Sequence, residues 1–95
     1  MRFLVEHALP AGTTREDIEE AQKAAMADKD VRGYRSFLNL TENKGYCIFD
    51  APSQEHLVKW LTQHEHQYDN IVEVELEGEH GRWVELPAPV GAANP

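Results

Sequence analysis

Apolar and polar residues alternate in several short stretches of this chain, and each stretch predicts a β-strand. In the first stretch, residues 2–9, Phe3 and Val5 share one face of the strand. Leu4 and Glu6 lie on the opposite face. Similar stretches predict strands at residues 34–40, 46–50, 71–77 and, more briefly, 82–86.

Two longer segments have the apolar spacing of α-helices. The first begins at a capping box formed by Thr13 and Glu16 and runs to about Asp28. Its inward residues are mostly small, so we expect this helix to lie close to a sheet. They are Ile18, Ala21, Gln22, Ala25 and Met26. The second helix covers residues 53–64, and its inward residues are Leu57, Leu61 and His64.

Residues 46–53 join two similar halves of the chain, because a strand there runs directly into a helix. Asp50 and Ser53 are residue types that cap helix N-termini, and Pro52 is tolerated at a helix entrance. The resulting element order, β-α-β-β-α-β, is that of the ferredoxin-like α+β fold. It predicts a four-stranded antiparallel sheet with both helices on one face.

The other face of that sheet is left uncovered, which favours a homodimer that packs face to face. The residues expected there are Tyr34, Leu38, Tyr46, Ile48 and Trp83. We expect residues 1–86 to form a single domain and residues 87–95, which are rich in Pro, Ala and Gly, to form a flexible tail.

Composition narrows the choice of partners. The chain has 95 residues and a formal net charge of −8, which argues against binding to nucleic acid or to an anionic membrane surface. One cysteine excludes an internal disulfide, so a reducing cytoplasm is expected. The N-terminus becomes charged within a few residues, and we expect neither a signal peptide nor a membrane span.

Histidine and cysteine are the candidates for chemistry. His7 ends the first strand, either as an ordinary strand-end histidine or as a metal ligand. His64 closes the inward line of the second helix, and His66 follows at its end. The pair cannot share one helical face but could chelate a metal if the helix has already unwound. His56 is expected to face solvent from the first turn of its helix, and His80 to lie in a turn.

Cys47 lies in the middle of a strand, where a small buried apolar residue is the ordinary interpretation. A thiolate ligand would need a metal or a positive neighbour. Glu73, Glu75 and Glu77 alternate along the strand at residues 71–77, either as a solvated face or as oxygen ligands for a cation. The sequence has no Walker loop, GxGxxG, GxSxG, HExxH or CxxC motif.

Several segments of the chain are distinctive, above all the run from Cys47 to Ser53. They are Glu6–His7, Gly12–Thr13, Glu20–Ala21, Gly45–Glu55 and Ile71–Val74. These segments resemble a family of small bacterial proteins, the nickel-binding-protein-like family, which is otherwise grouped as a domain of unknown function. The resemblance covers roughly residues 2–78.

The resemblance implies a ferredoxin-like homodimer, and at least one member of the family is described as binding nickel. It matches His7 and Cys47 to a strand-end histidine and a strand cysteine of the family. A later family histidine falls near His64 to His66. The chain departs from the family at Gln22 and near Leu61, where members often have histidine.

Two main hypotheses follow. The first is a cytoplasmic protein that binds Ni²⁺, Cu²⁺ or Zn²⁺ through His7, Cys47, His64 and His66, since nitrogen and sulfur donors suit these ions. The second is a dimeric α/β-barrel-type protein, similar to monooxygenases or isomerases, that binds or converts a small molecule between sheet and helices. Its polar groups would be Glu6, Tyr34 and Tyr46. A purely structural interaction module is a third alternative.

Overall fold

Strand β1 (Arg2–Ala8) lies inside the main sheet and has the alternation expected from the sequence. In the computed structural model, which describes residues 1–86, Phe3, Val5 and His7 are buried while the residues between them are partly exposed. Strand β1 pairs antiparallel with β3 (Lys44–Asp50) and with β4 (Asn70–Glu73). The predicted tail at residues 87–95 lies outside the described residues.

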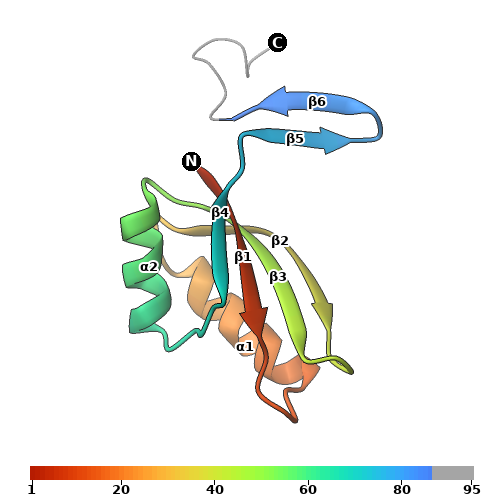
Figure 1. The fold of residues 1–95 in the computed structure, drawn as a ribbon. Helices are drawn as coiled ribbons and strands as arrows, with labels where there is room; N and C mark the ends of the chain where they lie inside the picture. The colour runs from red at the N-terminus through yellow and green to blue at the C-terminus, as the bar shows by residue number, and fades with distance from the viewer. Residues whose placement is uncertain (87–95) are drawn as a thin grey trace.

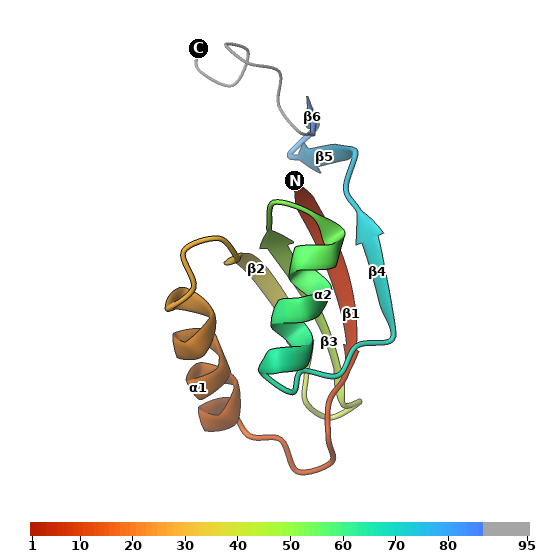
Figure 2. The same cartoon turned by 90° about the vertical axis from the view of Figure 1, so that its left-hand side faces the viewer.

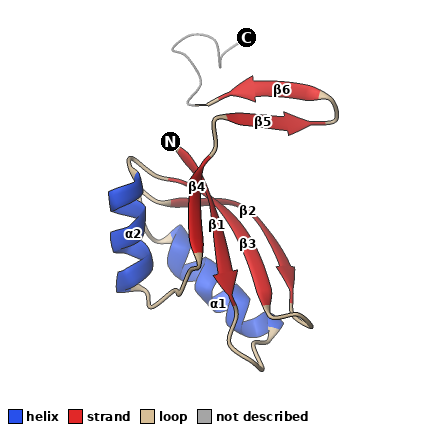
Figure 3. Ribbon diagram, in the orientation of Figure 1, coloured by secondary structure: helices blue, strands red, loops and turns tan. Residues whose placement is uncertain are grey.

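The sheet has the order β2-β3-β1-β4, with β2 (Arg32–Asn39) on the outer side of β3. Helices α1 (Arg15–Met26) and α2 (Gln54–Gln63) both lie on one face of it (Figures 1 and 3). The predicted ferredoxin-like α+β architecture is therefore confirmed. No helix within residues 1–86 is long and apolar enough to cross a membrane.

The two helices begin at side-chain caps. In α2, the predicted cap Ser53 accepts a hydrogen bond from the backbone N–H of His56, at 3.1 Å. In α1, the capping box is formed by Thr14 and Asp17, one residue later than predicted. The Thr13 hydroxyl instead donates to the carbonyl oxygen of Pro10 at 2.6 Å, so this residue belongs to the preceding turn. Both threonines have an acidic residue three positions on, and the sequence pattern alone did not separate them.

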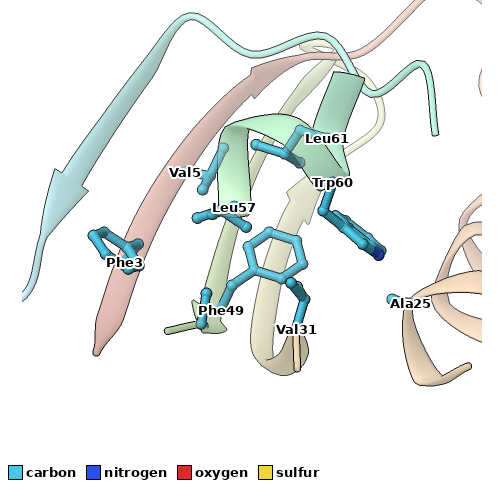
Figure 4. Close-up of a cluster of buried hydrophobic side chains, with 9 residues drawn as sticks. Phe3, Val5, Ala25, Val31, Phe49, Leu57, Trp60 and Leu61 are labelled. Atoms are coloured by element: carbon cyan, nitrogen blue, oxygen red, sulfur yellow. The ribbon is translucent and has the colours of Figure 1, made fainter. Parts of the chain in front are cut away.

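The hydrophobic core lies between the sheet and α2 (Figure 4). Helix α2 contributes Leu57, Trp60 and Leu61, whereas α1 contributes only Ala25. The rings of Phe49 and Trp60 meet at 5.6 Å with a tilt of 55°, a favourable geometry for an aromatic pair. The remaining buried apolar residues are Phe3, Val5, Val31 and Ala51.

The predicted strand at residues 71–77 is shorter than expected. Strand β4 ends at Glu73, because its partner β1 begins at Arg2 and offers no backbone groups beyond that residue. The last hydrogen bond between the two segments is donated by the Val74 N–H to the carbonyl oxygen of Arg2, at 2.9 Å. The chain then forms a separate hairpin of β5 (Leu76–Glu79) and β6 (Arg82–Glu85), which extends beyond the end of the main sheet (Figure 1).

The hairpin turn consists of His80 and Gly81, both with positive φ, as a tight turn between twisted strands requires. Gly78 and Glu79 belong to strand β5, so the turn itself is only two residues long. The short C-terminal strand predicted at 82–86 is present as β6. Arg2 links the two sheets, because its guanidinium pairs with Asp50 at 2.8 Å and with Glu77 at 2.6 Å.

The uncovered face of the main sheet carries most, but not all, of the residues predicted for it. Tyr46 and Ile48 lie there, and the Tyr34 ring packs on the Arg2 guanidinium at 3.9 Å. Leu38 was wrongly predicted for this face. The register shifts between Gly33 and Arg35, so an alternation counted from Tyr34 moves by one residue.

As a result, Leu38 pairs with Gly45 on the helix side, and Phe37, which is 51% exposed, occupies the open face beside Tyr46. Trp83 was also wrongly assigned to this sheet. It lies in the separate hairpin and is 70% exposed.

Candidate functional site

A cavity of about 360 Å³ separates helix α1 from the sheet. The small inward residues of α1 were expected to let the helix lie close to the sheet, but a space remains in front of them. Three of the four predicted metal donors, His7, Cys47 and His66, line this cavity, and His64 does not. The other lining side chains are mostly apolar, and they include Leu9, Ile18, Ala21, Leu38, Phe49 and Trp60.

His7 faces the helices, and it is the one buried polar residue in the described part of the chain, at 8% exposure. Its Nδ1 lies 2.7 Å from the carbonyl oxygen of Gln67. Because a carbonyl oxygen can only accept, Nδ1 donates this hydrogen bond, and in the neutral imidazole the lone pair is then on Nε2. Histidines that bind metals in proteins are oriented in this way by a bond from the other ring nitrogen.

His64 and His66 are brought together by the end of helix α2. Glu65 adopts a positive φ of 57°, and the N–H groups of Glu65 and His66 bond to the carbonyls of Thr62 and Leu61 at 3.1 and 2.9 Å. This pair of bonds is the Schellman motif, which ends a helix by reversing the chain. The unwinding considered from the sequence is therefore present, and the two imidazole rings stack at 6.1 Å.

Both imidazoles also lie against Trp60, with ring centroids 4.6 Å away for His64 and 5.5 Å for His66. Burial lowers the pKa of His66, and the nearby His7 and His64 lower it further. His66 is therefore uncharged at neutral pH and keeps a lone pair for a ligand or a metal.

Cys47 is half-buried, and burial raises the pKa of its thiol. The Ser36 hydroxyl donates a hydrogen bond to the sulfur at 3.4 Å, which acts weakly in the opposite direction. The thiol is thus protonated at neutral pH and is a poor nucleophile.

A different group of side chains meets at one end of the two helices. Donor atoms of Asp28, Asp30 and His56 all lie within 4.8 Å of one another. Asp28 and Asp30 follow the end of α1, while His56 lies in the first turn of α2, and Figure 2 shows that these two helix ends lie at the same end of the sheet.

The carboxylate of Asp28 is held in place by the backbone. Its Oδ1 accepts hydrogen bonds from the N–H groups of Asp30 and Val31, at 2.7 and 3.0 Å. These bonds lower the pKa of Asp28, so the group is ionised at neutral pH. Oδ2 takes no part in them and remains for a ligand.

A family model described as nickel responsive protein SCO4226-like matches residues 3–74. The chain belongs to this SCO4226-like family. Among solved structures, it is similar to SCO4226 from Streptomyces coelicolor A3(2), with 25% sequence identity and a TM-score of 0.73 over 82% of this chain and 100% of that one. No protein with curated annotation matches the chain.

In this SCO4226-like chain, the residues proposed from the sequence to bind an organic ligand do not come together. Glu6 and Tyr46 pair across β1 and β3 on the uncovered face, and Glu6 lies 3.8 Å from the Lys44 ammonium. They cannot serve the cavity between helices and sheet, because neighbouring strand residues lie on opposite faces. Tyr34 borders the cavity at the bulge, but its ring stacks on Arg2.

Asp28, Asp30 and His56 are not recognisable as a group from the sequence. An Asp-x-Asp pair after a helix is a weak signal, and His56 was expected to face solvent. It is half-buried instead, because the C-terminal end of α1 lies beside the N-terminal end of α2. That proximity is a tertiary feature of the fold, and no local spacing encodes it.

Proposed function

We propose that this protein binds Ni²⁺, or a similar divalent ion such as Zn²⁺ or Cu²⁺, as a small cytoplasmic homodimer. The observation that carries the proposal is the donor group of Asp28, Asp30 and His56, whose ligand atoms lie within 4.8 Å of one another. The description of the family as nickel responsive supports it.

The chemistry of this donor group fits a divalent transition metal. Two carboxylates compensate the charge of the ion, and an imidazole nitrogen favours a borderline metal over Mg²⁺. Asp28 is already oriented by two backbone N–H groups, so little ordering is needed when a metal binds. Three protein ligands leave the remaining coordination positions to water.

The four donors predicted from the sequence form a second candidate set. His7 presents a free Nε2, and His66 is uncharged, which are the states that a metal requires. Within residues 1–86, however, no three of His7, Cys47, His64 and His66 place donor atoms as close as the Asp28 group does. Metal binding here needs a rearrangement, so we rank this set second.

The uncovered sheet face supports the proposed homodimer. Ile48, Leu4 and Val72 lie side by side across β3, β1 and β4, and Phe37 lies beside Tyr46 in the next row. An apolar surface that runs over four strands is costly to leave in water, and a second copy of the chain covers it most simply.

Native mass spectrometry of untagged protein with and without Ni²⁺ tests both parts, since it reports subunit number and bound metal together. We expect a dimer that takes up nickel, and at least tenfold weaker uptake for Asp28→Asn and His56→Asn. Asparagine at position 28 keeps the two backbone hydrogen bonds, so the fold should be retained.

The matched controls are Asp69→Asn and His80→Asn, which change exposed residues outside both donor sets. Wild-type uptake by Asp28→Asn and His56→Asn would exclude the Asp28 group. Weaker nickel uptake by His7→Ala alone would instead indicate that the metal binds at the histidines of the cavity. A monomer at every concentration would contradict the dimer.

A further inference from the structure

Trp60 has a buried hydrogen-bond donor that the described residues leave without an acceptor. Its Nε1 has no partner, although the residue is only 2% exposed. Figure 4 shows this nitrogen directed away from the core, toward helix α1 and Ala25. An unsatisfied buried N–H costs about 1–3 kcal/mol, so the protein retains a polar group here at a cost to its own stability.

The unpaired N–H belongs to the wall of the cavity under α1. Trp60 and Ala25 both line this space, together with Phe49 from the sheet. Its volume of about 360 Å³ falls within the range of sites for small organic molecules, roughly 300–1,000 Å³. Aromatic rings on the wall favour a flat ligand that can stack on them.

The lining of the cavity offers no carboxylate or ammonium group that would pair with a charged organic ligand. The lining residues include no aspartate, glutamate or lysine. Arg35 is among them, but its guanidinium lies over the ring of Phe37, at 5.3 Å, on the opposite face of the sheet. A charged organic molecule entering this space would lose its hydration without gaining a counter-charge.

Access to the indole nitrogen requires a small movement of α1. Less than 1 Å² of Nε1 is accessible, so an acceptor can reach it only when this helix shifts outward. The helix is suited to such a shift, because Ala25 is its one buried residue and the neighbouring Met26 is 84% exposed. Few apolar contacts have to be broken, and segments of this kind open at low cost.

From these observations we infer that the cavity binds a neutral, flat aromatic molecule carrying a carbonyl oxygen, and that this oxygen accepts a hydrogen bond from Trp60 Nε1. The ligand fills the space under α1 and stacks against the aromatic wall. The site uses none of the residues Asp28, Asp30 and His56. The inference therefore goes beyond the proposed metal binding, and the two can be tested independently.

The test is a titration of the full chain, in the presence of EDTA, with coumarin, a neutral two-ring molecule with one carbonyl oxygen. Naphthalene is the matched probe without a carbonyl group. The readout is the ¹H–¹⁵N spectrum, where each tryptophan gives one indole N–H signal. We expect coumarin to move the Trp60 signal in a saturable way and to leave the signal of the exposed Trp83 unchanged, with at least tenfold weaker binding of naphthalene.

Two substitutions on the same helix locate the probe. Ala21→Leu fills the cavity and should weaken coumarin binding at least tenfold, whereas Ala24→Leu makes the same change outside the lining and should bind normally. Trp60→Phe keeps a ring but removes the donor, and should lower the preference for coumarin over naphthalene to less than about threefold.

Equal coumarin binding by Ala21→Leu and Ala24→Leu would overturn the inference, as would a Trp60 signal that does not move. Nickel uptake should be unchanged in Ala21→Leu. A protein that binds coumarin but no nickel would contradict the proposed function alone, and the reverse result would contradict this inference alone.

Discussion

Helix α2 places Leu57, Trp60 and Leu61 against the sheet, whereas helix α1, on the same face, buries only Ala25. Both helices are amphipathic and both begin at a side-chain cap, so neither amphipathicity nor capping explains the difference. The size of the inward side chains does. Leucine and tryptophan fill the space above the sheet, while the alanines of α1 leave a cavity.

This contrast separates two roles within one fold. The α2 side carries the packing that holds the domain together, and the α1 side carries the open space in which a ligand can be held. A domain of this size has little stability to spare, so it can leave only part of its interior unfilled.

The difference in packing between α1 and α2 is tested most directly by truncating one apolar side chain in each helix. Leu57→Ala should lower the free energy of unfolding by about 2–5 kcal/mol, because it opens a void in a filled core. Ile18→Ala should cost about 1 kcal/mol or less, because its side chain already borders a cavity. Urea denaturation measures both, and equal losses would show that α1 is packed as firmly as α2.

Removing the N-cap residue of each helix tests the same difference in packing, with a smaller expected loss of stability. Ser53→Ala should lower the free energy of global unfolding by about 1 kcal/mol, because α2 belongs to the core. Thr14→Ala should leave global unfolding nearly unchanged and instead accelerate amide hydrogen exchange within α1, which opens locally. Exchange that is accelerated equally in both helices would contradict independent opening of α1.

The smallest effect concerns pH and the imidazole that covers Trp60. The pKa of His66 lies below its usual value of 6.5 in the folded protein, so the unfolded chain takes up a proton first as the pH falls. The contribution of His66 to the free energy of unfolding should therefore be fully present above about pH 6.5 and should be lost as the pH falls below it. His66→Asn should flatten this part of the profile of Tm against pH, while His80→Asn should not. A wild-type profile that rises on acidification would contradict the lowered pKa.

Most of the fold could be predicted because its elements follow from local patterns. Alternating strands, helical spacing and the run from Tyr46 to Ser53 each specify one element, and their order specifies the topology. The features that were predicted wrongly lie where pairing with a neighbouring strand determines the face of a residue or the end of a strand. Leu38 changes face because of a bulge opposite β3, and β4 ends early because β1 has no residue left to pair with it.

The candidate site was less predictable for the same reason. His7, Cys47 and His66 were identified by residue type, and the sheet together with the end of α2 brings them to one cavity. The sequence did not decide whether Glu6 or His7 faces the helices. The structure places His7 on the helix side, and Glu6 on the uncovered face opposite Tyr46. Asp28, Asp30 and His56 meet only through the packing of two helix ends, and the unpaired Trp60 Nε1 is visible only when every neighbouring acceptor has been located.

The left-handed backbone at Glu65 has a consequence for how short histidine motifs are interpreted. In a β-strand, two histidines separated by one residue lie on the same side, and in a helix they lie about 200° apart around the axis. Here their rings lie nearly parallel, with centroids 6.1 Å apart, because the residue between them reverses the chain. The meaning of His-x-His is thus a property of the middle residue's backbone dihedrals, and comparisons between related chains should align the helix end before they align the histidines.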